Sequence, residues 1–448
     1  MNKLIVASLL LAVGAIALAA LASAWQPMRR YLLCGYFFGA TRLFDVNFAS
    51  HEQYRGWVRG FEIGSQDVIV FALLAAILAQ AGRHPPRWVP ALSLPILAWV
   101  TFAVLSATSS EVPLYALFGL LKFARYALAF WVVANAVRDE DDLRWVLWAI
   151  VGCAAIESFD AILDYAKGVY RVRGSFDHPN TLGMYLNMLA PVVLAALLNI
   201  RTRWAWFLFV VFGFTAGTVV LTLSRGSWVS FGLAVAIVLP LSLVLRFRPR
   251  KLGLVALMVA LAIPPGVFAV QKMARRIREA PASSGEARVE FNQVARQMAN
   301  ERAFGIGVNN FSYGTDGPYS EPFGDGLDRG GLCHNLYFLT AGELGWGGLA
   351  ALLWLLLAAF GRQLVFLARH LGEDLRSVMM LALLGSLATV VLQSSLEWAL
   401  LQTGLAMTFF GLLGIGSAIG RLRPGSRVTR YRITFRPAPV PERSPRGA

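Results

Sequence analysis

The chain has 448 residues, of which 57% are hydrophobic and 15% are charged, and its mean hydropathy is +0.57. A soluble domain usually carries about 25% charged residues, so this composition excludes an ordinary soluble enzyme. The formal net charge of +15 would suit a protein that binds nucleic acid. The basic residues, however, stand in short clusters between long uncharged runs, which excludes that class as well.

Twelve long apolar runs follow one another along the chain and predict membrane-spanning helices. A helix needs about 20 mostly apolar residues to cross the hydrocarbon core, which is about 30 Å thick. The runs cover 4–25, 66–82, 89–108, 113–137, 143–164, 180–199, 203–222, 227–246, 252–272, 334–360, 376–395 and 398–420. We therefore predict an all-α polytopic membrane protein with about twelve transmembrane helices. The first run is longer than the core of a signal peptide, which has about 7–15 residues, so we expect an uncleaved anchor, with cleavage as the alternative.

Basic clusters between the runs indicate the orientation. They stand near 83–87, 138–144, 201–203, 246–251 and 362–376, and in the tail after 420. If the twelve spans alternate strictly, all of these clusters fall on one side, which the positive-inside rule assigns to the cytoplasm together with both termini. Arg29, Arg30 and the group at 272–278 are exceptions and fall in the two longest outer segments. The outer segment 26–65 is expected to lie in the membrane interface as a helix or a re-entrant piece.

The other long outer segment, 273–333, is too long for a simple connection and is rich in polar residues and glycine. Apolar residues recur within it at helical spacing, which predicts an amphipathic helix over 286–302. They are Phe291, Val294, Ala295 and Met298. The chain is therefore expected to consist of a bundle of nine spans, a large outer loop, a bundle of three spans and a disordered cytoplasmic tail. These parts cover 1–272, 273–333, 334–420 and 421–448.

The sequence has only five histidines, and one of them is a candidate catalyst. His334 stands where the large loop re-enters the membrane. An imidazole with a pKa near about 6.5 is suited to accept a proton from a hydroxyl at neutral pH, so His334 is a candidate general base. The alternative is an incidental histidine near the start of a helix.

Two arginines on the same outer face are candidates for binding phosphate. Arg225 lies at the outer end of a span between uncharged runs, where a lone charge needs an anionic partner or a function. Arg288 lies near the start of the predicted amphipathic helix. The alternative to phosphate binding is that Arg288 lies on a solvated face of this helix. Guanidinium groups bind phosphate bidentately and stay charged, so two that converge would form a diphosphate clamp.

Other charged residues have less distinct roles. Arg173 and His178 form a further outer cluster. A helix that starts at 179, with the residue at 177 or 180 as its cap, would also explain the residues found there. Lys122 and Arg125 lie inside a predicted span, where we expect them to snorkel or to pair with Glu157 or Glu397.

Motifs for metals and cofactors are missing from the sequence. It contains no cluster of histidine, cysteine and acidic residues at metal-ligand spacing, no phosphate loop and no dinucleotide-binding motif. Its three cysteines are too few and too scattered for a disulfide framework or a metal site. We therefore expect neither a metal nor a cofactor.

Four short motifs, taken in order, resemble those of the O-antigen ligase and O-antigen polymerase superfamily of bacterial inner-membrane glycosyltransferases. They are Arg173-Gly174-Ser175-Phe176 with Pro179-Asn180, Ser224-Arg225-Gly226-Ser227-Trp228, Arg288 with Gly305-Ile306-Gly307-Val308, and His334-Asn335-Leu336-Tyr337 with Glu343-Leu344-Gly345. The resemblance covers roughly 170–415. Asp177-His178 departs from it, since a more neutral residue such as asparagine is expected there.

The resemblance implies a GT-C-like enzyme of the inner membrane whose site faces the periplasm. It implies transfer of a glycan from undecaprenyl diphosphate to the lipid A–core oligosaccharide, with His334 as the catalytic residue and Arg225 and Arg288 holding the donor diphosphate. Secondary candidates for the site are Arg173, His178 and Glu343. A single displacement inverts the anomeric centre, and the sequence shows no convincing carboxylate nucleophile for the retaining route.

Three other activities remain open from the sequence. An O-antigen polymerase and a protein O-oligosaccharyltransferase share the motifs, although the short tail after the last span disfavours the second. A flippase or transporter of lipid-linked glycans is the alternative from another class. Transporters place their charges near the middle of the bilayer within broken helices, whereas the candidates here lie at the outer ends of spans and in the loop.

Overall fold

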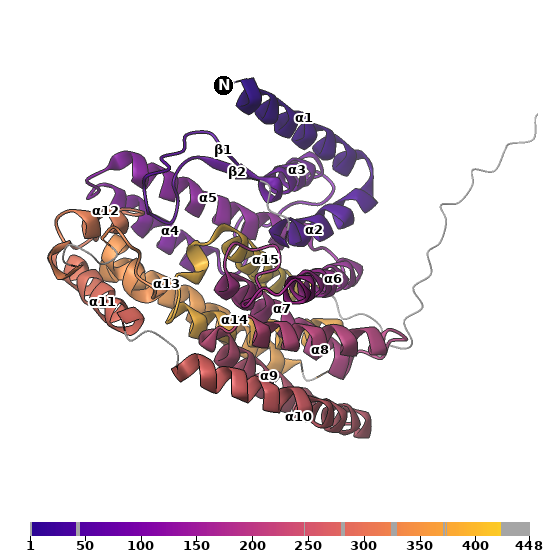
Figure 1. Cartoon of the computed structure of the whole chain (residues 1–448). Coiled ribbons are helices and arrows are strands. Elements are labelled where there is room, and N and C mark those ends of the chain that lie inside the picture. The colour runs from indigo at the N-terminus through magenta and orange to yellow at the C-terminus, as the bar shows by residue number, and fades with distance from the viewer. Residues whose placement is uncertain are drawn as a thin grey trace, which may run out of the picture.

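The computed structural model describes residues 2–41, 45–245, 247–278, 283–323, 329–370, 372 and 374–422. Helices make up most of this part of the chain, and most of them run lengthwise beside one another (Figure 1). The predicted disordered tail, apart from Arg421 and Leu422, lies outside the described residues.

The helices have the following bounds. The long ones are α1 (Asn2–Ala24), α2 (Gln26–Thr41), α3 (Ser65–Ala79), α4 (Ser93–Ala107), α5 (Pro113–Ala136), α6 (Glu140–Ala166), α7 (Pro179–Asn199), α8 (Ala205–Leu221), α9 (Arg225–Leu245), α10 (Pro249–Arg278), α11 (Ser283–Glu301), α13 (Leu336–Arg369), α14 (Leu375–Ser394) and α15 (Thr403–Ile419). The short elements are α12 (Phe311–Asp316), the 3-10 helices η1 (Glu321–Phe323) and η2 (Ala399–Leu401), and the antiparallel pair β1 (Asp45–Asn47) and β2 (Glu62–Gly64).

Each predicted apolar run overlaps one of these helices. Among the described residues, six helices are both long enough and apolar enough to cross a membrane, namely α5, α6, α7, α9, α13 and α14. Several shorter helices, including α3, α4, α8 and α15, are also apolar. The structure therefore supports an all-α membrane protein, and the number of spans stays a prediction.

The helix α7 lies at the centre of the bundle, because its side chains from Leu182 to Asn199 are all buried. Two hydroxyl groups of α14 donate hydrogen bonds to its main chain: Ser386 to the oxygen of Met188 at 2.6 Å, and Thr389 to that of Asn187 at 3.1 Å. Such contacts hold helices together where apolar surroundings alone do not. The start of α7 is thereby fixed at one end of the bundle.

The helix α2 corrects the predicted arrangement of the first outer segment. Arg29 and Arg30, near its start, donate to Asp142 at the start of α6, with Nε of Arg30 2.9 Å from Oδ1. Thr41, at its other end, lines a cavity at the opposite end of the bundle. The prediction that 26–65 lies wholly in the outer interface is therefore wrong. The buried carboxylate of Asp142 offsets the cost of burying the arginines, a pairing that the sequence does not reveal.

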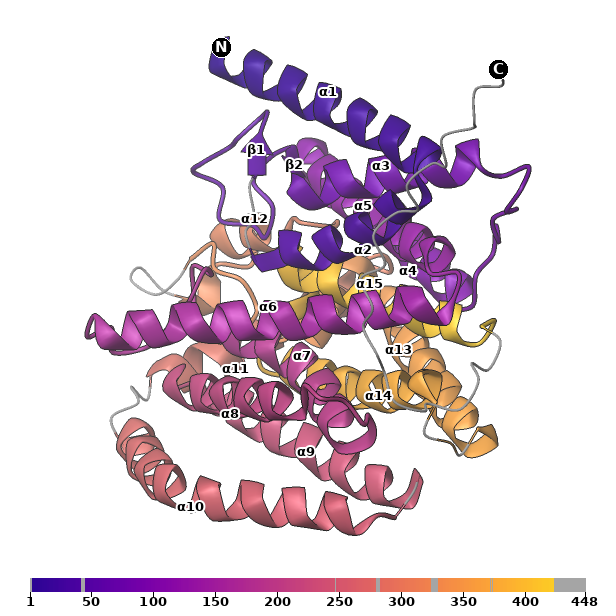
Figure 2. The ribbon, with the colours of Figure 1, turned by 90° about the vertical axis from the view of Figure 1, so that its right-hand side faces the viewer.

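The passage of α2 through the bundle determines at which end the N-terminus lies. Nε2 of Gln80, just after α3, donates to the main-chain oxygen of Ala22 at 3.2 Å, so α1 and α3 finish side by side. In Figure 2, α1 begins at the end of the bundle that carries α12 and finishes at the opposite end. The expectation that the N-terminus lies on the same side as the basic loops is therefore wrong, because α2 adds one more passage through the bundle.

The basic clusters gather at one end of the bundle, as predicted. Arg87 lies close enough to Arg362 and Arg421 to interact with them electrostatically. Arg29 and Arg30, the first predicted exception, join this end through their contact with the start of α6. We call it the basic end, and we call the other end, with the segments 167–178, 329–335 and 395–402, the site end. Which of them faces the cytoplasm stays a prediction.

The helix α11 confirms the predicted amphipathic helix and begins at Ser283. Its four apolar residues named above are at most 2% exposed, and the helix packs against α13. Gly345 in α13 has φ +74°, and a side chain there would collide with the main chain of Ala303. This glycine therefore bends α13 and lets the large loop lie directly on it.

Candidate functional site

His334 and Glu397 are hydrogen-bonded at the site end. Nδ1 of His334 lies 2.9 Å from Oε2 of Glu397. The imidazole is 44% exposed, whereas the carboxylate is only 12% exposed. A shielded carboxylate thus holds an imidazole that solutes can reach, and such a partner fixes the ring orientation and the tautomer.

The local fold explains how these two residues are presented. Asn335 is the N-cap of α13, because its Oδ1 accepts hydrogen bonds from the main-chain N–H of Tyr337 at 3.0 Å and of Phe338 at 3.3 Å. His334 precedes the cap and is not required for it. Glu397 lies in the short break between α14 and η2, where its N–H donates to the main-chain oxygen of Gln393.

Glu397 is the centre of a wider polar network. Nδ2 of Asn180 donates to its Oε1 at 2.8 Å, and a guanidinium nitrogen of Arg288 lies 3.5 Å from the same oxygen. Arg171 donates to the Oδ1 of Asn180 at 2.8 Å. Burial alone would raise the pKa of Glu397, but His334, Arg288 and Asn180 outweigh it and hold that pKa below its usual value. Glu397 is therefore ionised at neutral pH.

The large loop brings Arg288 to this network. Beyond the packing of α11 on α13, Sγ of Cys333 lies 3.1 Å from Oδ1 of Asn292, which ties α11 to the residue before His334. Burial raises the pKa of the Cys333 thiol to about 12, so the thiol is protonated and acts as a hydrogen-bond donor. The predicted helix therefore delivers Arg288 to the edge of the site.

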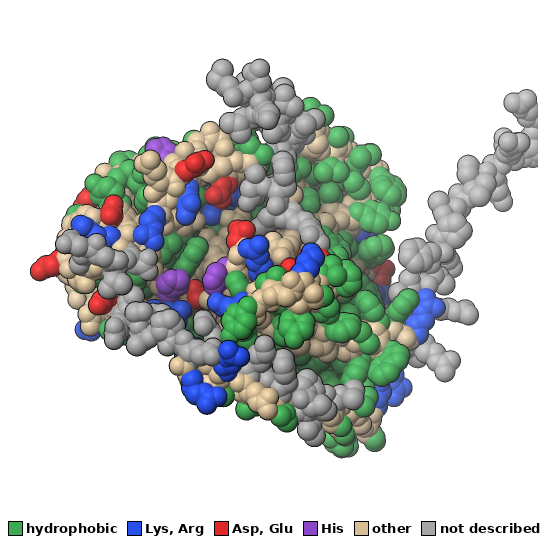
Figure 3. All heavy atoms as spheres, in the orientation of Figure 1, with side chains coloured by type: hydrophobic (Ala, Val, Ile, Leu, Met, Phe, Trp, Pro, Cys, Tyr) green, Lys and Arg blue, Asp and Glu red, His purple; other side chains and the backbone are tan. Residues whose placement is uncertain are grey.

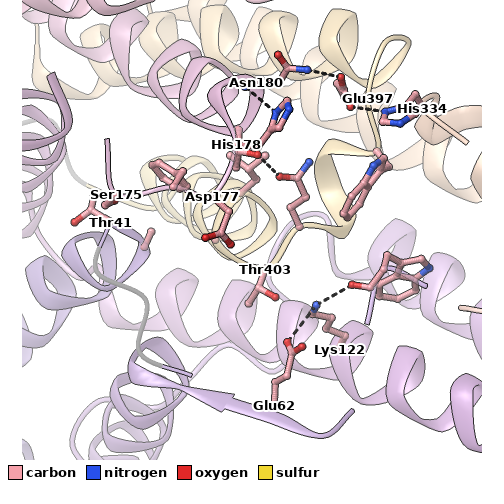
Figure 4. A pocket seen from close by; sticks show the side chains of 18 residues that line it. Thr41, Glu62, Lys122, Ser175, Asp177, His178, Asn180, His334, Glu397 and Thr403 are labelled. Carbon is pink, nitrogen blue, oxygen red and sulfur yellow. Dashed lines mark hydrogen bonds and ion pairs between the residues drawn. The ribbon is translucent and has the colours of Figure 1, made fainter. Parts of the chain in front are cut away.

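A cavity of about 790 Å³ opens beside His334 and Glu397 (Figure 4). Its other polar lining residues are Thr41, Glu62, Lys122, Ser175, Asp177, His178, Asn180, Thr181, Gln402 and Thr403. Figure 3 shows charged and histidine side chains gathered on the part of the surface near α11 and α12, with hydrophobic side chains over much of the rest. Among the described residues, no group of histidine, cysteine and acidic side chains is placed to hold a metal ion. The cavity is large enough for small-molecule groups such as sugar rings.

His178 lines the same cavity and is the N-cap of α7. Its Nδ1 accepts a hydrogen bond from the main-chain N–H of Asn180 at 3.1 Å, so the cap is neither of the two neighbours that the sequence suggested. Burial lowers the pKa of His178, and Arg171 and His334 act in the same direction against Glu397. The ring is therefore neutral at pH 7, and its proton lies on Nε2.

Arg225 lies beside the cavity without lining it. It is the exposed first residue of α9 and forms no hydrogen bond or ion pair with the residues that the structure describes. A side chain at the adjacent Gly226 would touch Leu396, the residue before Glu397. Arg225 therefore stands next to the segment that carries the carboxylate of the site.

Two of the secondary candidates lie away from the cavity. Arg173 is exposed, and its main-chain N–H donates to Asp164 at 3.1 Å. Glu343 is buried in α13, where its carboxylate accepts hydrogen bonds from the indole of Trp57 at 3.0 Å and the N–H of Phe311 at 3.3 Å. Glu343 therefore ties the first outer segment and the large loop to α13.

Lys122 and Arg125 have partners that the sequence did not indicate. Nζ of Lys122 lies 3.4 Å from Oε2 of Glu62, and a guanidinium nitrogen of Arg125 lies 2.6 Å from Oδ2 of Asp67. The two glutamates predicted as partners make other contacts, so that prediction is wrong. The reason is the position of β2 and the start of α3 against α5, which apolar patterning does not reveal.

The role of Glu397 was missed by reasoning from the sequence, although a signal for it existed. Glu397 is the single charged residue between Arg376 and Arg421. A lone carboxylate between two apolar helices needs a partner or a function. That its partner is His334, 63 positions earlier, follows only from the three-dimensional structure.

Residues 210–353 match the family model described as O-antigen ligase. This match supports membership of the chain in the O-antigen ligase superfamily. The matched segment runs from α8 into the first half of α13 and contains Arg225, Arg288 and His334, whereas Glu397 lies beyond it. No curated protein matches the chain. The family supports a membrane transferase that acts on lipid-linked glycans in O-antigen processing.

Proposed function

We propose that this superfamily member is an O-antigen ligase, which moves a glycan from undecaprenyl diphosphate to the lipid A–core oligosaccharide. The observation that carries the proposal is the His334–Glu397 pair, which faces a polar cavity and has Arg288 bound to the same carboxylate. The proposed setting is the bacterial inner membrane, with the site end in the periplasm and 273–333 as its periplasmic loop.

His334 is the proposed general base. A hydrogen bond to the ionised carboxylate of Glu397 requires a proton on Nδ1, so the lone pair of the neutral ring lies on Nε2. Nε2 takes the proton of the acceptor hydroxyl as that oxygen attacks the anomeric carbon of the donor. Glu397 is a positioning residue, because it orients the ring and stabilises the imidazolium that forms.

Arg225 and Arg288 are the proposed ligands of the donor diphosphate. The bond between the anomeric carbon and the diphosphate oxygen breaks as the new glycosidic bond forms, and its electron pair stays on the diphosphate. Two guanidinium groups stabilise that charge, and the N-terminus of α9 favours an anion beside Arg225. The single displacement inverts the anomeric centre. Because the diphosphate is an activated leaving group, the reaction requires no metal ion.

The test is glycan transfer by the purified full-length protein, with undecaprenyl-diphosphate glycan and lipid A–core as substrates. We expect His334→Ala to lower the rate by about 10²- to 10⁴-fold, the usual contribution of a general base. His84→Ala is the matched control, because His84 is exposed in the connection after α3, at the basic end. Transfer at the wild-type rate by His334→Ala would contradict the proposal.

A second experiment separates the ligase from related activities. Cells that lack a ligase carry core without any O-antigen, whereas cells that lack a polymerase carry core with a single repeat. Glycan found on a protein acceptor would identify an oligosaccharyltransferase instead. Loss of donor translocation with transfer intact would identify a flippase.

A further inference from the structure

The cavity has a second polar region, away from the His334–Glu397 pair (Figure 4). Lys122 of α5 and Glu62 of β2 form an ion pair there, and Nζ of Lys122 also lies 3.5 Å from the main-chain oxygen of Trp57. Lys122 is only 3% exposed. A buried, paired charge in the wall of a cavity is costly to keep unless it has a structural or a binding role.

Asp177 provides a third polar group in the cavity. It stands in the segment before α7, and its exposed side chain makes no hydrogen bond or ion pair with the residues that the structure describes. Figure 4 shows Asp177 turned toward the space between the His334–Glu397 pair and the Lys122–Glu62 pair. Its carboxylate is therefore available to a bound molecule.

These groups suit the hydroxyls of a sugar better than a phosphate. The charge of Lys122 is matched by Glu62, so this region has no excess positive charge, and Asp177 adds a negative one. Carboxylates accept hydrogen bonds from hydroxyl groups, and an ammonium donates to them. Phe176 and Trp57 add aromatic surface to the same lining, against which the apolar face of a sugar ring can pack.

The position of the arginines indicates which sugar lies here. Neither Arg225 nor Arg288 lines the cavity, whereas His334 does. In a single inverting displacement, the attacking oxygen and the leaving oxygen lie on opposite faces of the anomeric carbon. With the diphosphate at the arginines, the attacking hydroxyl comes from the side of the cavity.

We propose that Asp177, Glu62 and Lys122 bind the acceptor sugar, the one whose hydroxyl attacks the donor. The ligand class is a neutral pyranose at the reacting end of the acceptor glycan. This subsite rests on the proposed function, since it takes His334 as the base and the arginines as the donor site. Its residues determine which acceptor is used and take no proton themselves.

The test measures the kinetics of Asp177→Asn and Glu62→Gln with lipid A–core and undecaprenyl-diphosphate glycan. We expect each change to raise the KM for lipid A–core about 10-fold, the effect of losing one hydrogen bond to a charged group. The KM for the donor and the kcat should change by less than about 2-fold. Glu111→Gln is the matched control, because Glu111 lies at the site end, pairs with Arg302 and does not line the cavity.

Folding is checked by the melting temperature of each variant. Glu62→Gln removes the charge partner of Lys122, whereas Asp177→Asn removes no contact within the described part of the chain. If Glu62→Gln does not fold, Asp177→Asn therefore decides the question. A higher KM for the donor alone would overturn the proposal, as would a lower kcat with both KM values unchanged. Wild-type kinetics in Asp177→Asn would also overturn it.

Direct binding separates this subsite from the proposed reaction. Lipid A–core is titrated into wild-type protein and Asp177→Asn without any donor. If the wild type transfers glycan but both proteins bind lipid A–core equally, the subsite is wrong and the proposed function stands. If the wild type transfers nothing but binds lipid A–core at least about 5-fold more tightly than the variant, the proposed function is wrong and only the role of Asp177 in binding this glycan stands.

Discussion

Arg288 and His334 contact opposite oxygens of one carboxylate, that of Glu397. The guanidinium lies 3.5 Å from Oε1 and the imidazole 2.9 Å from Oε2. One residue comes from the loop helix α11 and the other precedes α13. In the proposed reaction, the group that binds the leaving diphosphate and the group that takes the acceptor proton therefore share one anion. If a bound diphosphate draws Arg288 away from Glu397, the carboxylate keeps its hydrogen bond to His334.

Replacing Glu397 with Gln should slow the chemical step. We expect Glu397→Gln to lower kcat by roughly 10²-fold, because the amide neither fixes the tautomer of His334 nor stabilises the imidazolium. Both KM values should stay within about 3-fold, and Glu397→Asp should recover part of the rate. Steady-state kinetics with each substrate varied in turn check this. A rise in both KM values at unchanged kcat would contradict a positioning role.

The stability that Glu397 contributes should depend on pH. Its pKa is lower in the folded protein than in the unfolded chain, so ionised Glu397 stabilises the fold at pH values above the usual 4.5. That contribution is lost as the pH falls through the lowered pKa. We therefore expect Glu397→Gln to reduce the melting temperature in detergent more at pH 7 than near pH 3, which is about 1.5 units below the usual pKa. An equal reduction at both pH values would contradict this.

Lysine should not replace Arg288 in glycan transfer. Arg288→Ala should lower the rate of transfer by about 10²-fold, the usual loss when a group that stabilises developing charge is removed. Arg288→Lys should recover little, because an ammonium cannot bind phosphate bidentately. Arg296→Ala is the control, since Arg296 is exposed on the same helix and has no described contact with Glu397. Full activity of Arg288→Lys would argue against a bidentate diphosphate contact.

The passage of α2 through the bundle predicts which segments share a side of the membrane. Cysteines introduced at Asn2 and at the exposed Glu111, in the turn between α4 and α5, should react with a membrane-impermeant maleimide from the same side. A cysteine introduced at Arg83, in the connection after α3, should react from the other side. The wild-type protein gives the background of its own three cysteines. Labelling of Asn2→Cys together with Arg83→Cys would show that α1 and α2 are arranged differently.

Apolar patterning predicted the helices well, because membrane helices must hide their main-chain polar groups whatever their neighbours are. The period of Phe291, Val294 and Met298 likewise predicted the helix that lies on α13, since one apolar face needs a partner surface. His334 and Arg288, both singled out by their position in the loop, do meet at the site through Glu397.

Pairwise charge contacts between distant segments could not be predicted from the sequence. The segment of α2 was predicted to lie in the interface, whereas α2 passes through the bundle, where Asp142 pairs with Arg29 and Arg30. The same holds for Lys122 with Glu62 and for Glu397 with His334. In each case the sequence shows a charge that needs a partner, and only the packing of helices shows which partner is near.

The cavity is lined from Ala40 in α2 to Leu405 in α15, which is most of the length of the chain. Because the chain is synthesised from the N-terminus, Asn180 and His334 are made before Glu397. Until the last two helices have entered the bundle, the imidazole has no carboxylate to hold it, and the pocket lacks one wall. If the proposed function is correct, a nascent or truncated chain that lacks these helices is therefore inactive toward lipid-linked glycans.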